Sequence, residues 1–137
     1  MTPIPYFTFQ GDCAEAMAKY ADVFGGTFRI VLRADERPDD FTPPKGQENW
    51  VMHAEVAFSD GVIYGSDDLM GGTPPMAGMS IAMNFPTARE AQAAFEALAD
   101  GGDVRTPFAP TFWSAGFGTL RDRWGKNWMI STTQTGP

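Results

Sequence analysis

The sequence has one cysteine, one histidine and few basic residues. Because Cys13 is the only cysteine among 137 residues, the chain forms no internal disulfide and builds no thiolate metal cage. The 10 Lys and Arg residues are outnumbered by 17 Asp and Glu, and a net charge of −7 argues against binding to a phosphate backbone. No apolar stretch reaches membrane-spanning length, and the N-terminus lacks a signal-peptide pattern. We therefore expect a cytoplasmic protein that binds neither nucleic acid nor membrane.

Aromatic and thioether side chains are well represented. The chain contains 4 Trp, 11 Phe and 8 Met residues, which fill hydrophobic cores and also line apolar ligand pockets. A length of 137 residues with 43% hydrophobic residues suits one globular domain. Cys13 lies in a helical pattern, where a small core-facing residue is favoured over a nucleophile.

Two stretches, residues 11–30 and 86–105, resemble one another. Each begins with a residue suited to cap a helix, Asp12 or Thr87, followed three positions later by a glutamate that can reach back. Apolar residues then recur at helical spacing, and each stretch ends at a Gly-Gly pair suited to a left-handed helix end. The pattern predicts two equivalent helices.

Alternating apolar and polar residues predict strands around both helices. The predicted strands are 4–10, 27–34, 50–58 and 62–66 in the first half, and 79–85, 103–109, 114–121 and 127–133 in the second. The order βαβββ therefore occurs twice, which predicts an α+β fold with mixed sheets. We expect a single domain with one module at about 1–69, a Gly-, Pro- and Met-rich linker at about 70–78, and a second module at about 79–137.

The only histidine, His53, lies two residues before Glu55 in a predicted strand, so both side chains are expected on one face. Three interpretations stay open for this pair. The carboxylate orients the imidazole for proton abstraction, the pair hydrogen-bonds a ligand without chemistry, or the two groups satisfy each other.

The same alternation predicts a set of ligand-binding side chains. On the opening strand, Phe7 and Phe9 are expected to lie on the same face of the sheet as His53 and Glu55. Tyr6 and Thr8 are expected on the opposite face, which packs against the first predicted helix. The other candidates are Trp50, Ser80, Asn84, Trp113 and Met129. Together they predict an apolar, aromatic bowl with a few polar groups, as small-molecule sites usually have.

Two further patterns bear on function. Residues 34–49 are acidic and proline-rich without a period, which is typical of a mobile surface loop and also of a lid or a dimer-contact arm. The glycines at 116–118 are not followed by a helical pattern, so no Rossmann cofactor loop is predicted. With one histidine and no serine in a nucleophile elbow, no Ser/His/Asp triad is predicted either.

Three segments carry a family resemblance: PYFTFQGDCAEAMAKYADVFGG (5–26), MHAEVAF (52–58) and TFWSAGFGTLRDRWGKNWMI (111–130). With them the chain resembles the vicinal oxygen chelate superfamily, which includes glyoxalase I, bleomycin-resistance proteins and extradiol dioxygenases. Within it, the chain is most similar to the PhnB-like branch, often labelled 3-demethylubiquinone-9 3-methyltransferase-like. The resemblance implies paired modules with sheets curved around a cavity, and a homodimer.

The resemblance also implies four metal-ligand positions, which correspond here to Pro5, Glu55, Ser80 and Met129. Only Glu55, with His53 beside it, is a good ligand for a divalent ion, and such ions normally need three protein donors. We therefore expect no metal, no cofactor and metal-independent binding of a small molecule. The alternatives are a lyase or isomerase with His53 and Glu55 as the catalytic acid/base pair, or a metal-dependent enzyme of the superfamily.

Overall fold

The computed structural model describes residues 1–136. The chain divides into two compact units, Met1–Pro74 and the part that begins at Pro75. Among the described residues, no helix has both the length and the apolar character that a membrane span requires.

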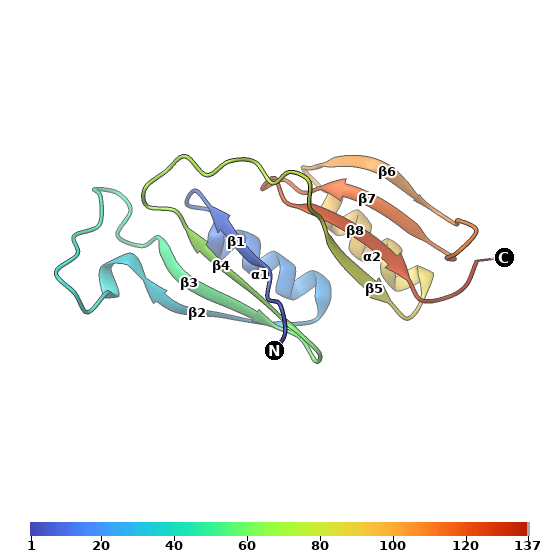
Figure 1. The fold of residues 1–137 in the computed structure, drawn as a ribbon, viewed down its shortest axis with the longest axis horizontal. Helices are drawn as coiled ribbons and strands as arrows, with labels where there is room; N and C mark the ends of the chain where they lie inside the picture. Colours follow the sequence, from blue (N-terminus) through green and yellow to red (C-terminus); the bar gives the residue numbers. More distant parts are fainter. Residues whose placement is uncertain (137) are drawn as a thin grey trace. The chain divides into compact units, whose positions relative to one another are not determined.

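The first unit is a four-stranded sheet with one helix on one face (Figure 1). In chain order its elements are β1 (Tyr6–Phe9), α1 (Cys13–Phe24), β2 (Thr27–Arg33), the 3-10 helix η1 (Ala34–Glu36), β3 (Val51–Ala57) and β4 (Val62–Asp67). The strand order is β1-β4-β3-β2, in which β1 and β4 are parallel and the other neighbours antiparallel.

The second unit repeats this topology (Figure 1). Its elements are β5 (Ile81–Phe85), α2 (Ala88–Ala99), β6 (Asp103–Ala109), β7 (Phe117–Arg121) and β8 (Asn127–Thr132). The strand order is β5-β8-β7-β6. The edge strand β5 is again parallel to its neighbour β8, and the other neighbouring strands are antiparallel. The predicted α+β fold, with βαβββ occurring twice, is confirmed.

Both helices bury one apolar stripe against their own sheet. The buried residues of α1 are Cys13, Ala16, Met17, Tyr20 and Ala21, and those of α2 are Ala91, Ala94, Phe95 and Leu98. Their spacing of three and four residues keeps them on one side of a helix. Cys13 has no exposed surface, which confirms its prediction as a core residue.

The two helix N-termini are capped in different ways. Thr87 accepts a hydrogen bond from the Glu90 backbone N–H at 3.2 Å, as predicted. Asp12 makes no capping bond with its side chain, so its prediction as an N-cap is wrong in that respect. Asp67 at the end of β4 instead accepts from the N–H groups of Gly11 and Cys13, at 2.8 and 3.0 Å. A carboxylate from a strand distant in sequence therefore accepts the hydrogen bonds of the free N–H groups at the start of α1.

The predicted facing of β1 is wrong. Phe7 and Phe9 are 5% and 3% exposed, and the Phe7 ring lies 5.8 Å from that of Tyr20 in α1. They are core residues on the helix side, whereas Tyr6 lies on the face that carries Glu55. Alternation defines two faces of a strand but not which one is buried, and the register with β4 decides it: Tyr6 and Glu55 both pair with Tyr64.

The segment between η1 and β3 extends past the ends of β2 and β3 (Figure 1). At its base the Ala34 N–H donates to the Trp50 carbonyl at 2.8 Å. Within it the Arg37 guanidinium lies 3.9 Å from the centre of the Phe41 ring and is paired with Asp39. The segment is thus tied together locally, and its role as a lid or dimer arm stays a prediction.

Candidate functional site

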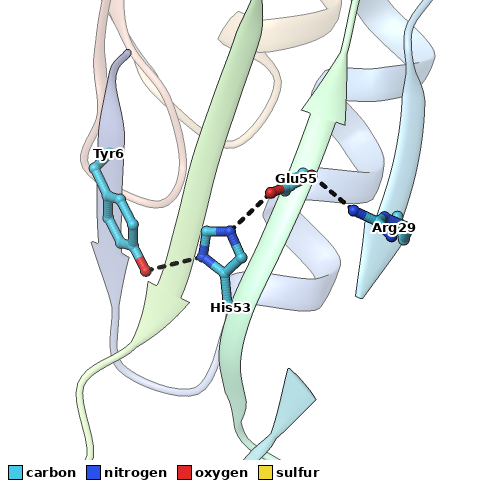
Figure 2. A network of polar contacts seen from close by, with 4 residues as sticks. All are labelled: Tyr6, Arg29, His53 and Glu55. Carbon is cyan, nitrogen blue, oxygen red and sulfur yellow. Dashed lines mark hydrogen bonds and ion pairs between the residues drawn. The ribbon is translucent and has the colours of Figure 1, made fainter. Parts of the chain in front are cut away.

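Four polar side chains of the first unit form a continuous array across its sheet (Figure 2). His53 Nε2 lies 2.9 Å from Glu55 Oε2, and the Tyr6 hydroxyl lies 3.2 Å from His53 Nδ1. On the other side Arg29 Nη2 donates to Glu55 Oε1 at 3.0 Å. The side chains come from β1, β3 and β2, so groups far apart in sequence are bonded in the order Tyr6–His53–Glu55–Arg29. We call these four residues the polar array.

Strand register places the polar array on one face. Tyr6 pairs with Tyr64, Tyr64 with Glu55, and Glu55 with Arg29, which makes one row across all four strands. His53 joins that face because it lies two residues before Glu55 on β3. The Tyr64 ring, on the intervening strand, lies edge-on to His53 with 4.8 Å between ring centres. The helix α1 covers the opposite face of the same sheet (Figure 2).

Glu55 is the charged centre of the array. The hydrogen bond from His53, followed by that from Arg29, holds the pKa of the Glu55 carboxyl below its ordinary value. The group is therefore an ionised carboxylate at neutral pH, and an ionised carboxylate only accepts hydrogen bonds. It follows that His53 Nε2 carries a hydrogen and donates it to Glu55.

Exposure differs along the array. The side chains of His53 and Glu55 are 26% and 25% exposed, whereas Arg29 is 68% exposed and Tyr6 is 50% exposed. The ends of the array therefore meet solvent more openly than its middle. This arrangement can bind a polar molecule at either end, and it can pass a proton between Tyr6 and His53.

The corresponding face of the second unit's sheet carries a different set of polar groups. Ser131 on β8 donates a hydrogen bond to Asn84 on β5, and Met129, which is 40% exposed, lies between Ala82 and Thr119 of the neighbouring strands. Ser80 is exposed just before β5. Besides this amide–hydroxyl pair, the same face carries Arg121, which donates a hydrogen bond to the Asn127 side-chain oxygen at 3.0 Å.

The two tryptophan candidates lie at the ends of strands. Trp50 precedes β3, and its indole packs on Gly11, where an added Cβ atom would lie 3.0 Å from the ring. Trp113 is 53% exposed and its ring centre lies 5.5 Å from that of Phe117. Trp128, in β8, is fully buried.

The donor set does not fit the metal centre that the superfamily resemblance implies. Within residues 1–136 no three His, Cys, Asp or Glu side chains gather closely enough to hold a metal ion. Both Glu55 oxygens already take hydrogen bonds, one of them from a cationic guanidinium. Of the other implied positions, Pro5 has no side-chain donor, and the hydroxyl of Ser80 and the thioether of Met129 are poor ligands for such ions.

Sequence reasoning found the middle of the polar array and missed its ends. His53 and Glu55 share a face, as the alternation predicted. Tyr6 was assigned to the wrong face, and Arg29 was not considered. The available signal was that Arg29 is a cation between the apolar residues Phe28 and Ile30 of a strand, where a partner on the neighbouring strand is expected.

Comparison with known proteins defines the family. The family model for 3-demethylubiquinone-9 3-methyltransferase matches residues 2–131. The crystal structure of protein PA1353 from Pseudomonas aeruginosa has a TM-score of 0.88 and 34% identity, covering 98% of both chains. The PhnB protein from Bacillus cereus has a TM-score of 0.79 and 26% identity, covering 96% of this chain and 99% of that one.

A more distant structure carries the same fold. It is a glyoxylase/bleomycin resistance protein/dioxygenase domain from Frankia sp. EAN1pec, with a TM-score of 0.66 and 15% identity over 100% of this chain and 92% of that one. The chain therefore belongs to the 3-demethylubiquinone-9 3-methyltransferase (PhnB-like) family, and it shares its fold with the glyoxylase/bleomycin resistance protein/dioxygenase domain.

Proposed function

We propose that the protein binds a small organic molecule over the polar array, without a metal or a cofactor. The observation that carries this proposal is the array itself, bonded in line across the sheet with both ends open. The side chains at both ends have hydrogen-bonding capacity beyond the bonds within the array. Here Arg29 presents a guanidinium with five N–H donors, of which one nitrogen bonds Glu55, and Tyr6 presents a half-exposed phenol.

The aromatic surroundings support the same proposal. Tyr6, His53 and Tyr64 lie together, with ring centres 4.8 to 6.0 Å apart. Rings beside a few oriented polar groups are typical of small-molecule sites. Trp50 stays proposed as a further ligand contact in the first unit, and Asn84, Met129, Ser80 and Trp113 stay proposed as ligand contacts of the second unit by itself.

A thermal-shift search over a broad small-molecule library tests this function. We expect at least one compound to raise the melting temperature of the wild type, and to do so less for His53→Ala and Arg29→Ala. Gln92→Ala, on the exposed side of α2, is the matched control and should respond like the wild type. Compounds that stabilise all variants equally would place binding elsewhere and contradict the proposal.

Acid/base catalysis is a second candidate because His53 and Glu55 lie in hydrogen-bond contact at 2.9 Å. A carboxylate that orients an imidazole is a common arrangement for a general base. If a ligand found in the search still binds His53→Ala and the wild type never converts it, the lyase or isomerase proposal fails.

Methyl transfer is not proposed for this chain. Gly116 and Gly118 flank the start of β7, whereas a Rossmann-type cofactor loop lies between a strand and a helix.

Metal analysis of the purified protein tests the metal-free proposal, and stoichiometric zinc, nickel, manganese or iron would overturn it. From the family resemblance we also propose a homodimer, which light scattering at several concentrations tests. The cytoplasmic location expected from the sequence stays a proposal.

A further inference from the structure

The polar array has a fixed direction because its centre can only accept. Glu55 is ionised, so His53 Nε2 donates to it and, in the neutral imidazole, Nδ1 is left as an acceptor. The Tyr6 hydroxyl, 3.2 Å from Nδ1, is then the donor of that bond. In both hydrogen bonds between Tyr6 and Glu55, the donated hydrogen therefore points in the direction of the Glu55 carboxylate.

This direction determines what Tyr6 presents to a ligand. A phenol has one hydrogen, and in this array it is used toward His53. The exposed side of the Tyr6 oxygen therefore offers only lone pairs, made more basic because consecutive hydrogen bonds polarise one another. At the opposite end, the exposed Arg29 guanidinium offers only donors. The two ends of the array have opposite hydrogen-bonding character.

We propose that Tyr6, and not His53, contacts the ligand of the site, by accepting a hydrogen bond from a ligand hydroxyl or amine. This inference rests on the proposed function and names the chemistry of its ligand. Both ring nitrogens of His53 are engaged, so His53 acts as a positioning residue behind Tyr6. A ligand that also reaches Arg29 carries an acceptor such as a carboxylate, which makes hydroxy acids and amino acids the matching class.

Protonation of His53 reverses this character. Once Nδ1 carries a hydrogen, it donates to the Tyr6 oxygen, and the phenol hydrogen turns outward as a donor. The ionisable groups facing the imidazole are Tyr6 from β1, Tyr64 from β4 and Glu55 from β3, and Arg29 from β2 acts through Glu55. Binding of a hydroxyl or amine is therefore expected to weaken as His53 becomes protonated.

The first measurement tests the direction of the array without any ligand. The chain has one histidine, so the imidazole nitrogen signals of the labelled full-length protein belong to His53 alone. In the neutral imidazole we expect the hydrogen on Nε2, and in Tyr6→Phe a shift of the Nδ1 signal that reflects a lost donor. A hydrogen on Nδ1 in the wild type overturns the inference.

The second measurement uses defined probes: aliphatic and aromatic hydroxy acids and amino acids of graded length, each beside its O-methyl or N-trimethyl counterpart. We expect parent compounds to bind more tightly than methylated ones, and binding of the parent compounds to be about tenfold weaker in Tyr6→Phe, the cost of one hydrogen bond of about 1.4 kcal/mol. The affinity for these probes should decrease as the pH is lowered, in parallel with the change in the His53 nitrogen signals that reports protonation. Gln92→Ala is the control.

Failure of the inference and failure of the function give different results. Equal binding of parent and methylated probes, or of wild type and Tyr6→Phe, overturns the role of Tyr6 while binding itself stands. The role of Tyr6 is also overturned if the broad search finds a compound that has no hydroxyl or amine and whose binding is weakened by Arg29→Ala. If no compound in either search binds, the proposed function is overturned.

Discussion

Glu55 joins the two halves of the polar array because its two oxygens take donors from opposite sides. His53, and then Arg29, depress the pKa of this carboxyl below its ordinary value of 4.5. A carboxyl whose pKa is lower in the folded state stabilises that state above the unfolded pKa. The stabilisation is lost as the pH falls through the folded pKa, where the carboxyl becomes protonated in both states.

Replacing Glu55 by Gln should therefore lower the free energy of unfolding at neutral pH and have progressively less effect in acid. Urea unfolding of both proteins over a pH series measures this difference. It should begin to shrink near the ordinary value of 4.5 and approach a minimum below the folded pKa. A difference that stays constant across the series would contradict the ionised pairing.

Asp67 is a buried carboxylate whose partners are backbone N–H groups. Oδ1 accepts from Gly11 and Cys13, and Oδ2 accepts from Val51 at 2.9 Å. Asp67→Asn places an amide donor against a backbone donor, so we expect a loss of about 2 kcal/mol in urea unfolding. The exposed Asp60→Asn is the control and should change stability by less than about 0.5 kcal/mol.

The site could be predicted from sequence only where one strand contained the signal. His53 and Glu55 lie two residues apart, so the alternation of a single strand brings them together. Tyr6 and Arg29 reach them through register with other strands, and register is a property of paired strands. The four-residue array therefore emerges only when the sheet is assembled.

The two helix starts make a matched pair for mutation. Thr87→Ala removes a side-chain acceptor for the Glu90 N–H, so we expect a loss of about 1 kcal/mol of stability. Asp12→Ala removes no capping bond and should cost clearly less. Thermal or urea unfolding of both variants measures the difference, and equal losses would contradict the assignment of capping to Asp67 in α1.

The Gly-Gly pair after each helix serves two separate purposes. Gly25 and Gly101 have φ angles of 69° and 76°, the left-handed region predicted for a helix end. Gly26 and Gly102 provide space instead: a Cβ atom on them would lie 2.8 and 2.3 Å from carbonyl oxygens of neighbouring backbone. The two Gly-Gly pairs are visible in the sequence, but the need for the second glycine of each pair follows only from the close packing of the folded sheet.

Gly102→Ala should therefore destabilise the protein through a steric clash with the Arg121 carbonyl oxygen. We expect a loss of about 2 kcal/mol or more, since a forced backbone shift in a packed region costs this much. Gly61→Ala, where an added Cβ meets nothing within 4 Å, is the control. Similar midpoints for both variants in urea would argue against close packing at Gly102.

The fold as a whole was predictable because repetition and periodicity reinforced one another. Helix positions, the order of elements along the chain and most boundaries follow from apolar spacing that recurs in both halves. The errors concern features that depend on distant contacts: the facing of β1 and the capping of α1 by Asp67. Local patterns specify elements, whereas their facing depends on which neighbours they meet.

For the whole molecule we propose one cooperative unfolding transition, in keeping with the single domain predicted. Each compact unit is small, and chains of that size bury too little surface to be very stable alone. Trp50 is the only tryptophan of the first unit, so fluorescence of Trp50→Phe follows the second unit, while far-ultraviolet circular dichroism follows both. We expect coincident urea curves, and separate midpoints would contradict a single domain.

The position of Asp67 also bears on the order in which the chain assembles. Its carboxylate reaches a backbone N–H 54 positions earlier, so α1 obtains this acceptor only after the last strand of its unit has been synthesised. A short helix is marginal before it packs. Thr87, by contrast, caps α2 from the adjoining residue. The N-terminal helix is therefore expected to gain this acceptor late during translation, whereas the cap of the second helix is present as soon as that helix has been synthesised.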